Sequence, residues 1–117
     1  MVIAASIAVG VVAFLHIAFF VMESVLWTTP QVRRVFGMGA EEANTTRILA
    51  LNQGGYNLGV AGLLIWFQWS QNPAGVSATL LFIVAMGLVG GFTASRGIIV
   101  VQSVPAAAAF ALVWMTG

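Results

Sequence analysis

Two ionisable side chains lie inside the first apolar segment of the sequence, and they are the residues best suited to do chemistry. His16 and Glu23 are seven residues apart, so in a helix they share one face about two turns apart. An ionisable group at membrane depth is costly to keep. Histidine titrates near neutral pH, which suits a proton relay, a general base or an axial haem ligand. Glu23 would serve as a proton carrier or as a general acid.

Both residues also have a structural interpretation. His16 could be a neutral imidazole that is hydrogen-bonded inside a helix bundle by Tyr56 or Asn57. Glu23 could form an ion pair with Arg47, or with the arginines of the surface segment that follows, and so join the first two spans. The sequence leaves the structural and the functional interpretation open for each residue.

A second polar group is the stretch 52–57, which has the sequence NQGGYN. Four of its side chains, Asn52, Gln53, Tyr56 and Asn57, can form hydrogen bonds, and two glycines lie between them. Glycine leaves room and amides orient a polar group, which favours a ligand cradle. The structural alternative is hydrogen bonding between closely packed helices. We favour the cradle because so many amides exceed what packing alone requires.

Counting along the helices predicts that these groups meet. At a rise of 1.5 Å per residue, Glu23 lies roughly 6 Å and His16 roughly 16 Å inside the membrane boundary. The stretch 52–57 lies on the order of 10–17 Å deep on the second span, and Gln102 about 6 Å deep on the fourth. Polar side chains in lipid do best facing one another. We therefore predict one ligand-binding cluster, with Arg47 as its counter-charge, made of His16, Glu23, Asn52, Gln53, Tyr56, Asn57 and Gln102.

The elements that position this cluster follow from the composition. Of 117 residues 61% are hydrophobic and 6% are charged, which is more apolar surface than a soluble domain of this length can bury. Since a span needs roughly 20 apolar residues, the chain is predicted to be all-α, an integral membrane four-helix antiparallel bundle in a single transmembrane domain, 1–117. The predicted helices cover about 2–27, 45–69, 74–94 and 98–114.

Local signals refine these elements. Thr29 as N-cap and Pro30 at the first helical position predict a short interfacial helix between the first two spans, ended by Gly37. Asn44 is the expected N-cap of the second span. Pro105 is expected to kink the fourth and free a carbonyl.

Glycine spacing predicts close helix packing. Gly55 and Gly59 on the second span, and Gly87 and Gly91 on the third, fit the small-x-x-x-small pattern. We expect both pairs to pack within the chain rather than between copies.

The arginines predict the orientation. Arg33, Arg34 and Arg47 lie in or beside the first connection, and Arg96 lies in the third, whereas the second connection and both termini carry no charged side chain. The positive-inside rule then predicts a multi-pass protein of the bacterial inner (plasma) membrane, with both termini outside and connections 1–2 and 3–4 in the cytoplasm. The first segment lacks a basic n-region and a cleavage site, so we expect a retained helix.

Several kinds of chemistry are poorly supported. One histidine, no aspartate and no cysteine cannot build an ordinary zinc or di-iron site within one chain. A Ser-His-Asp set cannot form either, and no basic patch suits nucleic acid. We therefore predict no metal and no cofactor, with haem on His16 as the one exception to consider. The expected partners are the lipid bilayer, a small amphipathic ligand and further copies of the chain.

The motif NQGGYN at 52–57 is accompanied by His16, Glu23, Trp27, Arg96 and Gln102–Pro105. With these residues the sequence resembles, over essentially its whole length, the DUF1304 family of small bacterial membrane proteins. The resemblance implies a four-helix membrane protein and points to the same polar residues. It implies no reaction, because the function of that family is unknown.

Three functions fit these residues. We favour a membrane protein that binds a small amphipathic molecule or relays protons, with proton-linked transport by a homo-oligomer in which Glu23 and His16 carry the proton. An alternative is an isomerase-like membrane enzyme for a lipophilic substrate, with His16 as general base or haem ligand and Tyr56 or Glu23 as acid. The third is a structural accessory subunit whose polar cluster only joins helices. The identity of the ligand cannot be read from the sequence.

Overall fold

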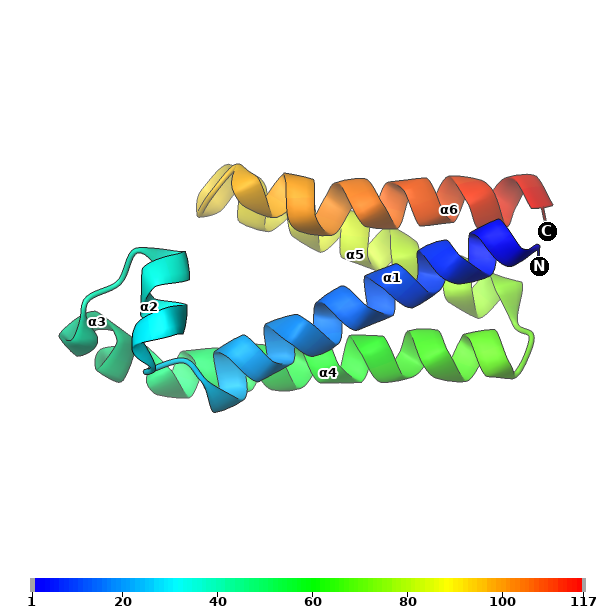
Figure 1. Ribbon diagram of the computed structural model, residues 1–117. Helices are drawn as coiled ribbons and strands as arrows, with labels where there is room; N and C mark the ends of the chain where they lie inside the picture. The colour runs from blue at the N-terminus through cyan, green and yellow to red at the C-terminus, as the bar shows by residue number, and fades with distance from the viewer. Residues whose placement is uncertain (1, 117) are drawn as a thin grey trace. The chain divides into compact units, whose positions relative to one another are not determined.

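Every regular element in residues 2–116, the range that the computed structural model describes, is helical (Figure 1). The predicted all-α class is therefore confirmed. In chain order the elements are α1 (Ile3–Phe20), the π-helix η1 (Val21–Val25), α2 (Pro30–Phe36), α3 (Ala40–Thr45), α4 (Arg47–Trp69), α5 (Pro73–Thr93), the π-helix η2 (Ile99–Ser103) and α6 (Val104–Thr116).

Four helical stretches are long and apolar enough to cross a membrane. They are Ile3–Val25, Arg47–Trp69, Pro73–Thr93 and Ile99–Thr116. Each end lies within two residues of its predicted position. The fold is therefore compatible with a multi-pass membrane protein.

The short helix α2 forms where the sequence predicts it. The hydroxyl of Thr29 accepts a hydrogen bond from the backbone N–H of Val32 at 3.4 Å, and Pro30 follows at the first helical position. Gly37 ends the helix in the left-handed region, with φ 65°, where a residue without Cβ meets no steric penalty.

The helix α3 was not predicted. Its first turn carries Glu41 and Glu42, and negative charge there is stabilising because the unpaired N–H groups of a helix start carry partial positive charge. Asn44 lies inside α3, so the prediction that it caps α4 is wrong. Thr46 separates the two helices instead, and its backbone N–H returns to the carbonyl of Glu42 at 3.0 Å.

The first and the last of the apolar stretches each contain a π turn. The N–H of Leu26 bonds the carbonyl of Val21 at 2.9 Å in η1, and the N–H of Val104 bonds that of Ile99 in η2. Both bonds span five residues rather than the four of an α-helix. Pro105 is the second residue of α6, just beyond η2, and has no N–H to donate, so the expected disturbance of this helix takes the form of a π turn.

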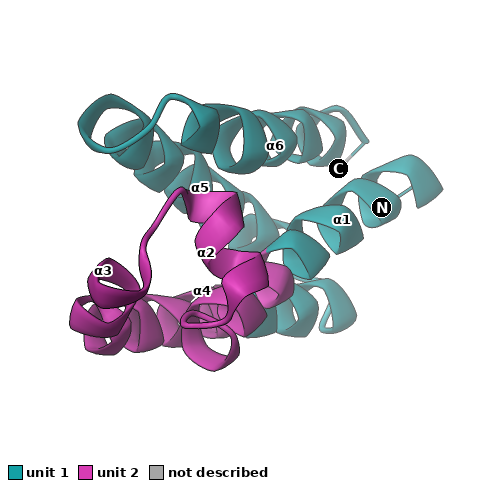
Figure 2. Ribbon diagram, turned by 60° about the vertical axis from the view of Figure 1, so that its left-hand side comes forward, with its two compact units in different colours: residues 1–15, 61–117 teal, residues 16–60 magenta. Residues whose placement is uncertain are grey.

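The chain divides into two compact units (Figure 2). Unit 1 holds the residues up to 15 and those from 61 onward, with α5, η2, α6, most of α1 and the end of α4. Unit 2 holds residues 16–60, with the end of α1, η1, α2, α3 and most of α4.

In unit 1, α5 and α6 run antiparallel and side by side (Figure 1). The fully buried side chains Leu80 and Ile83 of α5 and the nearly fully buried Val113 of α6 belong to its core. Gly87 lies against Ser103, and Gly91 against Ile99, with no space for a Cβ at either glycine. The prediction that the Gly87–Gly91 pair packs within the chain is therefore confirmed.

Candidate functional site

Glu23 and Asn57 meet in unit 2. The side-chain amide of Asn57 donates a hydrogen bond to Oε1 of Glu23 at 2.5 Å. Asn57 is buried on α4 and Glu23 is half-buried in η1. The bond joins a carboxyl group to a neutral amide inside two stretches apolar enough to span a membrane.

A close approach of the two backbones holds this pair in place. The hydroxyl of Ser24 donates to the backbone carbonyl of Leu51 at 2.9 Å. A Cβ at position 54 would overlap the Ser24 hydroxyl, so only glycine fits there. Ser24 and its role were missed from the sequence, although Gly54 within the NQGGYN motif was a signal of close approach.

The end of the same helix is fixed by Trp27. Its indole N–H donates to the hydroxyl of Thr46 at 3.0 Å, and its ring packs on Phe36 with centroids 5.0 Å apart. Trp27 thus joins α2 and the turn before α4.

His16 is buried, with 1% of its surface exposed. Its ring lies edge-on to Phe19, with centroids 5.3 Å apart. Seven residues along a helix correspond to roughly 10 Å along its axis, so His16 and Glu23 are too far apart for a direct hydrogen bond. A proton could pass between them only through another group or through water.

Three residues of the predicted cluster point away from the chain. Asn52 and Gln53 are exposed, and Tyr56 has 68% of its surface exposed. Their membership of a ligand-binding cluster stays a prediction. The helical period explains the exposure of Asn52, since the buried Ala61 lies about 180° from it around α4.

Arg47 does not pair with Glu23 in the described part of unit 2. Arg47 is exposed at the start of α4, and no ion pair links it to Glu23. Asn57, the partner of the Glu23 carboxyl group, is ten residues from Arg47. This corresponds to roughly 15 Å along the helix, so Arg47 lies well away from the pair. Gln102 lies half-buried in η2, which belongs to unit 1.

Unit 1 repeats one part of this arrangement. Ser103 lies in η2 and donates its hydroxyl to the carbonyl of Val84 at 2.9 Å. Gly87 comes three residues after Val84, as Gly54 comes three residues after Leu51, and each glycine faces the serine hydroxyl. Each π turn thus presents a serine to a glycine of another apolar helix. The acidic side chain and its amide partner occur in unit 2.

A family model named "Protein of unknown function (DUF1304)" matches residues 10–114. The chain belongs to the DUF1304 family. The match covers most of the chain, including both π turns, Glu23 and Asn57. No curated protein and no solved structure matches the chain.

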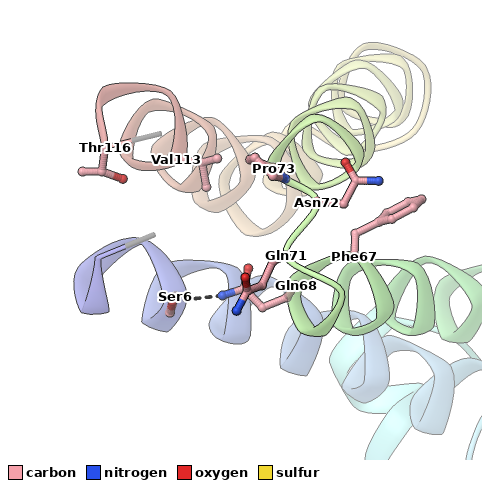
Figure 3. Close-up of a pocket in the computed structure, with 8 residues that line it drawn as sticks. All are labelled: Ser6, Phe67, Gln68, Gln71, Asn72, Pro73, Val113 and Thr116. Atoms are coloured by element: carbon pink, nitrogen blue, oxygen red, sulfur yellow. Dashed lines mark hydrogen bonds between the residues drawn. The ribbon is translucent and has the colours of Figure 1, made fainter.

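The DUF1304 chain also contains a cavity of about 460 Å³ in unit 1 (Figure 3). Its polar groups come from Ser6, Gln68, Gln71, Asn72 and Thr116, none of which is charged. Gln68 donates its amide to the hydroxyl of Ser6 at 2.9 Å. Ser6 and Thr116 lie outside the range that the family model matches. The cavity therefore offers weaker grounds for a family function than the Glu23–Asn57 pair.

The side chains of the DUF1304 protein suit proton and hydrogen-bond chemistry. Within residues 2–116 no three side chains among histidine, aspartate and glutamate lie close enough to hold a metal ion. Glu23 can accept a proton or a cationic group, and Asn57 can orient the carboxylate while it does so.

Proposed function

We propose that this DUF1304 protein binds small amphipathic cations at Glu23 and exchanges them for protons across a membrane. The observation that carries the proposal is the hydrogen bond from Asn57 to Glu23 inside two apolar stretches. Glu23 is the sole acidic residue in the sequence of the four stretches, since Glu41 and Glu42 lie in α3. An acidic group at membrane depth is costly and is expected to have a function.

The chemistry of the pair supports an exchange. A bound proton and a bound cation each neutralise the carboxylate, and a neutral group is less costly in apolar surroundings than a charged one. The two therefore compete for Glu23. Asn57 keeps one carboxylate oxygen oriented in both states, because a side-chain amide can donate to either form. His16 is the second titratable group in this span and a candidate for the proton path.

We further propose that the protein lies in a bacterial plasma membrane with both termini outside. The distribution of arginine supports this orientation, since all four arginines lie beside the first and third connections.

Binding of tetraphenylphosphonium, a lipophilic cation, tests the proposal. The purified protein in lipid vesicles is compared with Glu23→Gln, and Glu42→Gln is the matched control in the exposed α3. Loss of a charge pair at a partly buried site is worth on the order of 1–4 kcal/mol, so affinity should fall about tenfold or more in Glu23→Gln. Affinity should stay unchanged in Glu42→Gln. Equal binding by all three proteins would refute the assignment of Glu23.

Proton exchange has a separate readout. With a pH-sensitive dye inside the vesicles, inward movement of the cation should drive protons outward in the wild type and not in Glu23→Gln. Cation uptake without any proton movement would contradict the exchange.

A structural role is the competing function, because the same hydrogen bond joins two helices. The Glu23→Gln variant distinguishes the structural role from cation binding. Glutamine at position 23 can still accept the bond from Asn57. If the bond is only structural, Glu23→Gln should therefore change neither the stability of the protein nor its binding of tetraphenylphosphonium by a measurable amount. A wild-type protein that binds no lipophilic cation would favour this role.

A further inference from the structure

The helix α4 carries an unpartnered face within unit 2. Ile48, Asn52, Gly55 and Gly59 follow one another at spacings of four, three and four residues, and all four are exposed. Apart from the adjacent residues and the nearby backbone of α4 itself, no heavy atom of the described residues lies within 4 Å of the position of a Cβ at Gly55 or Gly59. The prediction that these two glycines pack within the chain is therefore wrong.

This face is unlike a surface suited to lipid. Asn52 lies five residues inside an apolar stretch, and its side chain is exposed. Acyl chains offer no hydrogen bonds, so an amide facing them has unpaired donors and acceptors. The glycines beside it form a shallow strip along which another helix backbone can approach closely.

A second copy of this chain would satisfy the polar group on this face. An amide is both donor and acceptor, so two Asn52 side chains across a twofold axis satisfy each other. The spacing of four and three residues is that of a seam between two paired helices, in which a polar residue fixes the register. The same spacing continues along α4 to Gly62 and Trp66. Copies in one membrane share their orientation, so the pair would be parallel.

We propose that α4 pairs with α4 of a second copy through Ile48, Asn52, Gly55 and Gly59, with Asn52 hydrogen-bonded to the partner subunit's Asn52. Glu23 and Asn57 lie outside this seam, and Asn57 is buried on the other side of α4. The dimer and the proposed cation site are therefore separate claims.

Disulfide cross-linking tests the seam directly, because the chain has no cysteine of its own. Gly55→Cys and Gly59→Cys should each form a covalent dimer on oxidation in lipid vesicles, since the same residue of both copies lies at the seam. Leu58→Cys is the matched control, because it is exposed on the same helix but turned by about 100° from residue 59. Cross-linking of Leu58→Cys as efficiently as the glycine variants would overturn the proposal.

Energy transfer between differently labelled copies measures the dissociation constant in vesicles. Asn52→Leu and Gly59→Leu should each raise it about tenfold, the effect of one hydrogen bond or one close contact between membrane helices. A Cβ at Gly59 meets open space, so the Gly59→Leu monomer should keep its helical circular dichroism and its binding of tetraphenylphosphonium. A wild-type protein that stays monomeric at every protein-to-lipid ratio would also overturn the proposal.

Discussion

Ser24 and Gly54 are in direct contact, so that the serine hydroxyl occupies the space that a side chain at position 54 would need. The same relationship joins Ser103 and Gly87 in unit 1. Because each serine also donates to a carbonyl of the helix that carries the glycine, neither can move away without losing a hydrogen bond. The Ser24–Gly54 contact fixes the approach of η1, which carries Glu23, to α4, which carries Asn57.

Gly54→Ala is therefore expected to destabilise the protein by about 1–3 kcal/mol, the usual effect of overpacking. Thermal unfolding in detergent micelles, followed by circular dichroism, measures the change. Gly10→Ala is the control, since a Cβ at position 10 of α1 meets no atom within 4 Å. The closeness of the Ser24–Gly54 contact would be contradicted if Gly54→Ala and Gly10→Ala unfolded at the same temperature.

Asn57 and Glu23 should respond unequally to substitution. Asn57→Leu leaves the Glu23 carboxyl without its amide partner and should cost about 1–3 kcal/mol. Glu23→Gln keeps an oxygen that accepts the bond, so its stability should stay within about 0.5 kcal/mol of the wild type. Unfolding in a denaturing detergent series measures both. A larger loss in Glu23→Gln than in Asn57→Leu would show that the charge, rather than the hydrogen bond, holds the helices.

The parts of the fold that depend on local signals were predictable from the sequence. The four apolar stretches follow from run lengths, and α2 follows from Thr29, Pro30 and Gly37, which act on their own neighbours. The π turns were not predictable in the same way. A five-residue hydrogen bond such as that between Leu26 and Val21 depends on packing between helices as well as on composition.

The candidate site was predictable only in part. The depths predicted from the helical rise assumed that the first two spans enter the membrane at the same level. On that assumption Glu23 lies level with the first turn of the second span, and His16 lies level with Asn57. The structure pairs Glu23 with Asn57 instead. The outward positions of Asn52 and Tyr56 were also missed, because in an apolar chain both sides of a helix carry similar residues and the hydrophobic period is weak.

Trp27→Phe should lower stability by about 0.5–1.5 kcal/mol, because the bond to Thr46 is lost while the ring can still pack on Phe36. Thr46→Val removes the same bond and also the one that the Thr46 hydroxyl donates to the carbonyl of Glu42. Because the Trp27–Thr46 bond is lost in both single variants, the double variant should cost less than the sum of the two. Trp69→Phe is the control because 80% of Trp69 is exposed. Strictly additive losses would mean that Trp27 and Thr46 act separately.

The proposed orientation predicts which connections a membrane-impermeant maleimide reaches. Ser70 follows α4, and Ser95 lies between α5 and η2 beside Arg96. Both serines are exposed, and cysteine is close to serine in size, so Ser70→Cys and Ser95→Cys should fold as the wild type does. With the arginine-bearing connections in the cytoplasm, the reagent added to intact bacterial spheroplasts should label Ser70→Cys at once. Ser95→Cys should react only after the membrane is permeabilised. Immediate labelling at position 95 with protection at position 70 would reverse the orientation, and it would also place Glu23 nearer the outer surface.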